Sequence, residues 1–410
     1  MSNHGEATVF TDVQVFDGTG SDPFPAEVLV EGNRITKVAD RIPLARLTRA
    51  RVIDGGGGTL IPGLVDAHTH LGFGSTTEHT SRRRDEPDEE KALLVAHAGR
   101  VMLDHGFTSA YSGGNRLPRT EVAARKAFAE GWMPGPRYKA ASWEGTAGMR
   151  EPGVYTFPGT EGRPSDPRSV SRFVDEMADV GVDIVKLSLS GESAVVQGTS
   201  RIVQFTDEEV AAAAATARAR GVWLTAHAHA AESVKMAVRH GIRAVYHCTF
   251  ADEEALDLLA AARDRLFVAP TPGIIHANLY EAGSEPEPGM EVEATAKAVR
   301  QVVPELVSRG IRVVPGGDYG FAWNPVGRNA RDLELFVDWF GFTPAEALRA
   351  ATYLGGQVMD MGGELGLVRE GFLADLVLVD GDPLEDIRIL QHADRLTAVM
   401  KDGALHKAPA

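Results

Sequence analysis

The sequence predicts an α/β protein, a (β/α)8 TIM barrel with a small β-sandwich domain formed by both ends of the chain. Three observations support this fold. Short strands and turns fill residues 1–60, short apolar runs alternate with helices through residues 61–364, and strands return in residues 365–410. Strands that alternate with helices about eight times predict parallel strands closed into a barrel. The 410 residues accommodate a barrel of about 250 residues and a second module.

The small domain is expected to contain strands from both termini. Glycine-rich turns separate the first strands, and no apolar pattern of helix length occurs among them. The expected N-terminal strands are Thr8–Phe16, Glu27–Glu31, Arg34–Val38 and Arg51–Asp54, and the C-terminal ones are Ala374–Val379 and Leu396–Met400. Residues 1–60 and 365–410 are therefore predicted to form one domain around the inserted barrel.

Amphipathic, alanine-rich segments predict the helices of the barrel. The clearest are Lys91–Asp104, Arg168–Val180, Asp207–Arg220 and Val292–Arg309. Thr206 followed three residues later by Glu209 predicts a capping box at the start of the third of these helices. Each helix is expected to follow a short, buried parallel strand.

Composition limits the possible partners. The formal charge of −15 opposes binding to nucleic acid or to an anionic membrane surface. Cys248 is the only cysteine, so no intrachain disulfide can form. The first residues lack a secretory signal, and no stretch approaches the roughly 18 apolar residues of a membrane helix. A cytoplasmic enzyme that acts on a small molecule or a peptide is therefore expected.

Five apolar runs of the barrel segment end in residues that can bind a metal. In chain order they end in His68-Thr69-His70, Lys186, His227, His247 and Asp318. Residues i and i+2 of a strand face the same side, so His68 and His70 both point into the barrel mouth. Two imidazoles on one face can bind a metal, although one such pair alone could simply be hydrogen-bonded. Five such endings in one order favour a metal site.

Lys186, Asp318 and the nearby His229 each allow a further interpretation. A lysine inside a barrel must reach water, pair with a carboxylate or be modified. As a carbamate made with carbon dioxide, Lys186 would offer two oxygens that bridge two metals, whereas a plain lysine would extend from the strand end to solvent. His229 repeats the i, i+2 spacing after His227, yet a second metal needs only one of the two. Asp318 follows two glycines, which suit a tight strand exit.

These residues resemble the amidohydrolase superfamily, in particular its binuclear branch of imidazolonepropionase-like proteins, ochratoxin amidase, and Xaa-Pro and Xaa-Arg dipeptidases. The resemblance covers essentially the whole chain. It rests on Val65–His70 after Pro62-Gly63, Lys186, the spacing of 20 residues (247 − 227) between two histidines, Asp318, and Gly371–Leu378 followed by Asp380–Pro383.

The resemblance implies a role for each ligand. It implies that His68, His70 and Asp318 hold one divalent metal, that His227 and His247 hold a second, and that the carbamate of Lys186 bridges them. Zn²⁺ is the default for these ligands, and Mn²⁺ or Co²⁺ would also fit. His229 is expected to polarise the substrate carbonyl or to stabilise the oxyanion, with packing against the barrel wall as the alternative. Relatives of this kind also imply a homo-oligomer.

The expected activity is hydrolysis of a C–N bond. Two cations that share a water lower its pKa from about 15.7 towards roughly 7 and hold a bridging hydroxide for attack. Asp318 would carry the proton to the leaving nitrogen. An amide, a dipeptide, an N-acyl amino acid or a cyclic amide fits this chemistry. The alternatives are a mononuclear deaminase or cyclic-amidine hydrolase, which usually lacks the bridging lysine, and an inactive scaffold, which would have lost ligands.

Substrate contacts are expected from loops at the barrel mouth. The candidates are His276, in a predicted loop after the strand Leu266–Ala269, together with Tyr319 and Ser190. Arg82–Arg84 could meet a substrate carboxylate, although a solvated loop is the simpler interpretation. The stretch Trp143–Met149 departs from the glycine-glycine-histidine stretch of many relatives, so this part of the pocket is expected to be particular to this chain.

Overall fold

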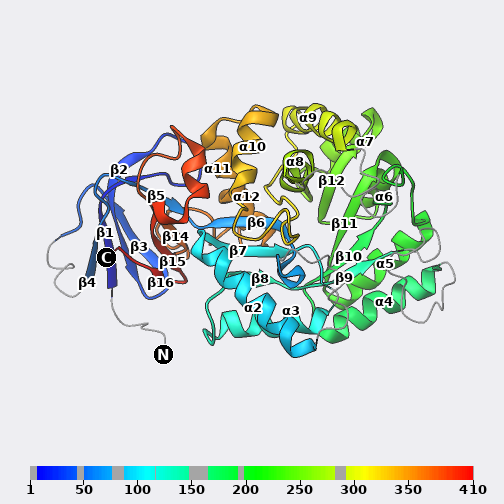
Figure 1. Cartoon of the computed structure of the whole chain (residues 1–410), viewed down its shortest axis with the longest axis horizontal. Helices are drawn as coiled ribbons and strands as arrows, with labels where there is room; N and C mark the ends of the chain where they lie inside the picture. The colour runs from blue at the N-terminus through cyan, green and yellow to red at the C-terminus, as the bar shows by residue number, and fades with distance from the viewer. Residues whose placement is uncertain are drawn as a thin grey trace.

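The computed structural model describes residues 7–43, 50–75, 87–115, 117–146, 165–192, 198–281 and 292–409. Two units lie side by side, a sheet that combines the N- and C-terminal strands and a larger unit of strands and helices (Figure 1). The expected contact at Arg82–Arg84 lies outside the described residues, as do residues 147–149 of the stretch Trp143–Met149.

The smaller unit is one eight-stranded sheet. Its strands are β1 (Ala7–Val15), β2 (Phe24–Glu31), β3 (Arg34–Ala39), β4 (Ala50–Asp54), β5 (Thr59–Pro62), β14 (Leu376–Val379), β15 (Leu396–Lys401) and β16 (Ala404–Lys407). The order is β16-β15-β14-β5-β1-β2-β3, and β4 also pairs with β1. β14 from the tail runs antiparallel to β5, so strands from both ends of the chain share this sheet. The sequence analysis missed β16.

The larger unit contains two parallel sheets. One holds β6 (Leu64–Thr69), β7 (Phe107–Ser112) and β8 (Arg137–Lys139), and the other holds β9 (Ala141–Gly145), β10 (Ile184–Ser188), β11 (Trp223–Ala230), β12 (Ala244–Phe250) and β13 (Phe267–Ala269). Residues 313–319, which come after β13 and α9 (Val292–Ser308), form only single bridges among the described residues, from Val313 to Val268 and from Tyr319 to Thr69. Pro315 in this segment lacks an N–H donor, which limits ladder formation. The arrangement is TIM-barrel-like, without a continuous closed sheet among the described residues.

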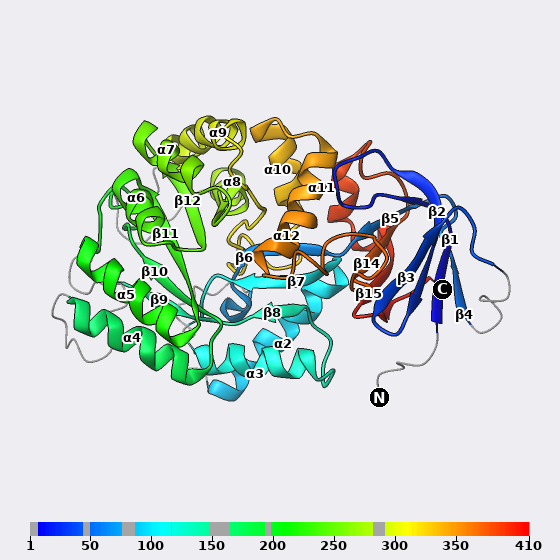
Figure 2. The same ribbon diagram turned by 180° about the vertical axis from the view of Figure 1, so that it is seen from behind.

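Helices follow most of these strands and lie outside them (Figures 1 and 2). They are α2 (Asp88–Asp104), α3 (Pro118–Ala129), α4 (Pro167–Val180), α5 (Asp207–Arg220), α6 (Ala231–Arg239), α7 (Glu253–Ala261), α8 (Pro272–Tyr280), α9 (Val292–Ser308), α10 (Arg331–Phe340), α11 (Pro344–Ala351) and α12 (Tyr353–Val358). The four expected helices are confirmed, and the side chains of Thr206 and Glu209 form the expected capping box of α5.

The chain passes from the small sheet into the larger unit at Gly63. The apolar run that begins at Leu60 is divided here, because β5 ends at Pro62 and β6 begins at Leu64. A Cβ on Gly63 would lie 2.2 Å from Oγ1 of Thr108, so only glycine fits this close approach. The division places His68 at the carboxyl end of β6.

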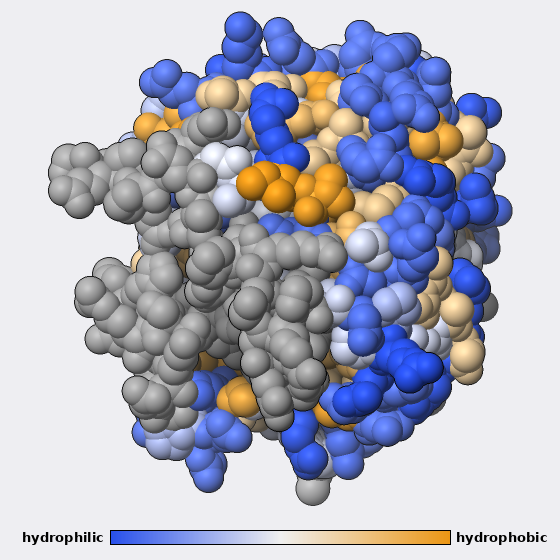
Figure 3. Space-filling view, turned by 90° about the vertical axis from the view of Figure 1, so that its right-hand side faces the viewer, coloured by the Kyte–Doolittle hydropathy of each residue, from blue (hydrophilic) through white to orange (hydrophobic). Residues whose placement is uncertain are grey.

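The outer faces of the helices are largely charged. Arg220 of α5, for example, pairs with Asp175 of α4 at 3.0 Å. The face of the larger unit in Figure 3 is mostly hydrophilic where it is coloured, with hydrophobic residues in several separate places. Among the described residues, none of the helices is long and apolar enough to span a bilayer.

Candidate metal centre

The structure brings the predicted ligands together at the carboxyl ends of the parallel strands. His68 and His70 lie at the end of β6, Lys186 lies in β10, and Asp318 follows the bridge residue Val313. His227 and His229 lie in β11 and His247 in β12. All five histidines and Lys186 are buried. These side chains form two neighbouring groups.

The first group consists of His68, His70 and Asp318, whose ligand atoms lie within 4.8 Å of one another. Oδ1 of Asp318 lies 2.9 Å from Nε2 of His70 and 3.5 Å from Nε2 of His68. Nδ1 of His70 donates to the carbonyl of Gly114 at 2.7 Å, so Nε2 of the neutral ring carries a lone pair. Ligand atoms that each lie about 2.0–2.2 Å from one Zn²⁺ are separated from one another by distances like those between Asp318 and the two histidines. These three residues therefore fit a metal.

The second group consists of His227, His229, His247 and Glu192, again with ligand atoms within 4.8 Å. Nε2 of His247 is buried and has no hydrogen-bond partner in the part of the chain that the structure describes, and its Nδ1 lies 2.8 Å from Oγ1 of Thr271. A ring nitrogen with no protein partner, held by a hydrogen bond to the other nitrogen, is the usual arrangement of a metal-binding histidine. His247 therefore fits a metal as well.

His229 differs from its neighbours in its partners. Its Nδ1 lies 2.8 Å from Oγ1 of Thr249, and its Nε2 lies 3.4 Å from Oε2 of Glu192. Because a carboxylate only accepts, Nε2 of His229 carries the proton in this arrangement. A histidine with a proton on the site-facing nitrogen can donate to a substrate oxygen. The sequence analysis missed Glu192, for which no spacing signal exists.

Lys186 contacts the first group, and its charge also acts on His227 and His247 of the second. Its Nζ is 3.0 Å from Nε2 of His68 and 3.6 Å from Oε1 of Glu144, the neighbouring residue on β9. The ring of Tyr246 stacks on His68 with centroids 3.8 Å apart, and Nζ of Lys186 lies 5.1 Å from the same Tyr246 ring. A buried lysine amine is thus held beside the first group.

Burial favours the neutral form of three of the imidazoles. It lowers the pKa of His68 and His247 well below the usual range and also lowers the pKa of His227. Nearby histidines and Lys186 lower these pKa values further, whereas the carboxylates beside His68 and His227 oppose the shift. Burial alone would raise the pKa of Asp318, but His68, His70 and Lys186 hold it below its usual range. The centre therefore offers neutral nitrogen donors and an ionised carboxylate, the forms that bind a divalent cation.

Several residues of the centre have left-handed backbone conformations. The φ angles are 71° at His247, 55° at Thr271 and 61° at Asp318. Such conformations cost about 1–3 kcal/mol each in residues other than glycine and cluster at functional sites. Gly316 allows the strand before Asp318 to approach β6, because a Cβ there would lie 2.7 Å from the backbone N of His68. The expectation of a tight strand exit at the glycines is confirmed.

The three expected substrate contacts have different surroundings. Ser190 is fully buried, and its Oγ accepts from the backbone N of His229 at 2.8 Å. The ring of Tyr319 is also fully buried, and its hydroxyl donates to Asp332 at 2.9 Å, so it holds the backbone and does not face a substrate. The prediction that His276 lies in a loop is wrong, because α8 begins at Pro272 and contains this residue. Nδ1 of His276 lies 3.6 Å from Glu281.

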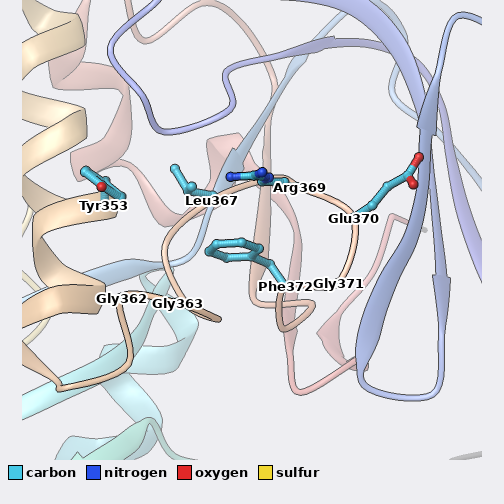
Figure 4. Close-up of a pocket in the computed structure, with 8 residues that line it drawn as sticks. All are labelled: Tyr353, Gly362, Gly363, Leu367, Arg369, Glu370, Gly371 and Phe372. Atoms are coloured by element: carbon cyan, nitrogen blue, oxygen red, sulfur yellow. The ribbon is translucent and has the colours of Figure 1, made fainter.

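A separate pocket lies between α12 and the loop before β14 (Figure 4). It is lined by Tyr353, Gly362, Gly363, Leu367, Arg369, Glu370, Gly371 and Phe372. None of the buried histidines lines it. We therefore place the chemistry at the histidine groups and not in this pocket.

Groups of histidine, carboxylate and lysine at the strand ends of a TIM-barrel-like fold are typical of metal-dependent hydrolases. The sequence model described as "Amidohydrolase family" matches residues 59–405, and the chain belongs to this family. It is a hydrolase that acts on C–N bonds.

Similarity to individual proteins extends over most of the chain. Ochratoxinase of Aspergillus niger is 26% identical over 379 residues, which cover 85% of this chain and 76% of that protein. Imidazolonepropionase of Rubrobacter xylanophilus is 25% identical over 93% of this chain and 91% of its own length. A crystal structure of a Xaa-Pro dipeptidase with bound methionine superposes with a TM-score of 0.86 at 26% identity, covering 98% of this chain and all of that one.

Proposed function

We propose that this chain is a two-metal amidohydrolase that cleaves an amide, a dipeptide, an N-acyl amino acid or a cyclic amide. The observation that carries the proposal is the position of Lys186, whose Nζ contacts the first group of histidine and carboxylate side chains and whose charge acts on His227 and His247 of the second. A one-metal deaminase would have no use for a lysine at this position. The names of the relatives, among them an ochratoxinase and a Xaa-Pro dipeptidase, support amide and dipeptide substrates.

We assign each residue of the centre to one of the two metals. His68, His70 and Asp318 would hold one metal and His227 and His247 the other, with Lys186 as a carbamate between them. When bound, the two cations supply Lewis acidity and lower the pKa of a water. We further infer that the two parallel sheets are parts of one closed barrel and that the small sheet folds as a β-sandwich.

Asp318 and His229 would act on the substrate side of the centre. Asp318 is ionised and can accept a proton from the attacking water and return it to the leaving nitrogen. His229 carries its proton on Nε2 and would donate it in a hydrogen bond to the substrate carbonyl oxygen as negative charge develops there. Thr249 and Ser190 fix the ring and the backbone of His229, respectively.

The test combines metal content with hydrolysis. Elemental analysis of the wild type after loading with Zn²⁺ is expected to give near two metals per chain, and Lys186→Ala is expected to lose most of one or both. Lys235→Ala is the matched control, because Lys235 of α6 is also buried but pairs with Asp252 at 2.9 Å. The loaded wild type should release amine from at least one dipeptide, N-acyl amino acid or cyclic amide, and a chelator should abolish this release.

One metal or fewer in the wild type, unchanged in Lys186→Ala, would contradict the two-metal proposal. Two metals without hydrolysis of any substrate in the panel would contradict the assigned substrate classes and leave the metal centre standing.

A further inference from the structure

Glu144 is a carboxylate of the centre that neither the expected ligand set nor the mechanism uses. It lies on β9 directly beside Lys186 of β10. Its Oε1 is buried and has no hydrogen-bond partner among the described residues, although the side chain as a whole is 28% exposed. The same oxygen lies 3.6 Å from Nζ of Lys186 and 3.8 Å from Nδ1 of His227. Burying a carboxylate oxygen without a hydrogen bond is costly unless a cation compensates for it.

Two carboxylates flank His227, one at each ring nitrogen. Glu144 faces Nδ1 at 3.8 Å, and Glu192 faces Nε2 at 3.7 Å. The hydrogen bond of the ring distinguishes the two sides. Nε2 lies 3.2 Å from the carbonyl of Gly191, which can only accept, so Nε2 carries the proton and Nδ1 carries the lone pair. A metal on His227 must therefore lie on the Nδ1 side, where Glu144 is the nearby carboxylate.

We propose that Glu144 is a further ligand of the metal held by His227 and His247, an assignment that rests on the proposed two-metal function. The 3.8 Å between Oε1 and Nδ1 is short enough for one cation about 2.0–2.2 Å from each atom. Among the described residues, Oε1 of Glu144 and Nε2 of His247 are both buried without a hydrogen-bond partner, and ligation of a cation would satisfy atoms of this kind. The carboxylate also adds negative charge beside Lys186, so the second metal depends less on carbamate formation.

The competing explanation is that Glu144 serves only as the counter-ion of the Lys186 ammonium. The two explanations differ in what Glu144 does to metal affinity. A counter-ion holds Lys186 as an ammonium and opposes carbamate formation, so its removal leaves metal binding unchanged or makes it tighter. A ligand makes the second metal bind more tightly, and its removal weakens that metal alone.

The experiment measures the two Zn²⁺ dissociation constants of the full chain by competition with a chromophoric chelator. Glu144→Gln is expected to bind the first Zn²⁺ within two-fold of the wild type and the second at least ten-fold more weakly. Glu192→Gln is the comparison variant, since it removes the same charge 3.7 Å from the protonated Nε2 of His227. It should weaken the second constant by less than Glu144→Gln does. Glu144→Asp should recover part of the second affinity.

A second readout separates ligation from charge. Titration with Co²⁺ should show a changed visible absorption band for the second equivalent in Glu144→Gln and an unchanged band in Glu192→Gln. Two Zn²⁺ bound with wild-type constants by Glu144→Gln would overturn the assignment of Glu144 while leaving the two-metal function intact. Equal weakening in both variants would also overturn it, because that result reports net charge. A wild type that binds only one Zn²⁺ would overturn the two-metal function itself.

Discussion

At the scale of single residues, the second nitrogen of each histidine determines what the first can do. Gly114 accepts from Nδ1 of His70 and Gly191 from Nε2 of His227, so the two rings present opposite nitrogens to the centre. Glu192 accepts from Nε2 of His229, which turns this ring into a donor. In three of the five buried histidines, a backbone carbonyl or a carboxylate therefore fixes which ring nitrogen carries the proton.

Gly113 tests how closely the first group is packed. A Cβ at this position would lie 2.4 Å from Cδ2 of His68 and 2.6 Å from Nε2 of His70. Gly113→Ala must therefore displace both rings, and we expect the first Zn²⁺ to bind at least ten-fold more weakly, measured by chelator competition. Gly363→Ala is the control, because a Cβ there meets nothing within 4 Å. Full affinity in Gly113→Ala would show that the rings can shift without loss of the site.

The residues of the candidate centre were predictable from sequence because each ends an apolar run, and strand ends meet at one edge of parallel sheets. Glu144 and Glu192 were not, since a single carboxylate near a strand end carries no periodic signal. The left-handed backbone at His247, Thr271 and Asp318 was equally hidden, because none of these residues is glycine. Tyr319 lies beside Asp318 in sequence, yet its ring turns away to Asp332, which sequence proximity cannot reveal.

At the scale of elements, local signals were predicted well and long-range ones less well. α5 has the predicted limits because its capping box and periodicity lie within the helix itself. The segment around Val313 was expected as a strand but makes only single bridges among the described residues, since strand formation depends on its neighbours. His276 was expected in a loop, whereas the proline at the start of α8 begins a helix. Where the ends of an element depend on contacts with distant segments, the local sequence pattern does not predict them.

Asp332 connects α10 to the strand-end segment and predicts a pH dependence of stability. It is fully buried, and its carboxyl group accepts from Gly316 N at 2.9 Å and from the Tyr319 hydroxyl at 2.9 Å. Burial, with a further contribution from the charge of Asp66, raises the pKa of Asp332 to about 8. The folded state thus holds this proton more tightly than the unfolded state does.

The sign of the effect follows from proton linkage. Between the unfolded pKa of about 3.9 and the folded pKa, the folded state binds more protons, so stability falls as pH rises, by up to about 1.4 kcal/mol per pH unit. Asp332→Asn cannot titrate and should show a flatter dependence of the denaturation midpoint on pH between pH 5 and 8. Parallel curves for wild type and variant would show that Asp332 is ionised in the folded protein throughout this range.

At the scale of the whole molecule, an arginine joins the two units. Arg137 of β8 in the larger unit donates to Asp375, which precedes β14 of the small sheet, at 2.6 Å, and it also pairs with Asp402 in the turn after β15. Asp375 is buried, with its side chain 1% exposed, whereas Arg137 is 16% exposed. Asp375 also accepts from the backbone N of Asp402 at 2.9 Å. One guanidinium therefore compensates the charge of a buried carboxylate at the junction.

Removal of Arg137 should cost more than removal of any surface arginine. Arg137→Met leaves the buried carboxylate of Asp375 without its partner, and we expect a loss of about 3–5 kcal/mol in the free energy of unfolding by urea denaturation. Arg388→Met, which removes an exposed pair with Asp386, should cost no more than about 1 kcal/mol. The double variant Arg137→Met, Asp375→Asn should recover part of the loss, because it removes the uncompensated charge as well as its partner. Equal losses in Arg137→Met and in the double variant would instead assign the cost to lost packing of the arginine side chain between the two units.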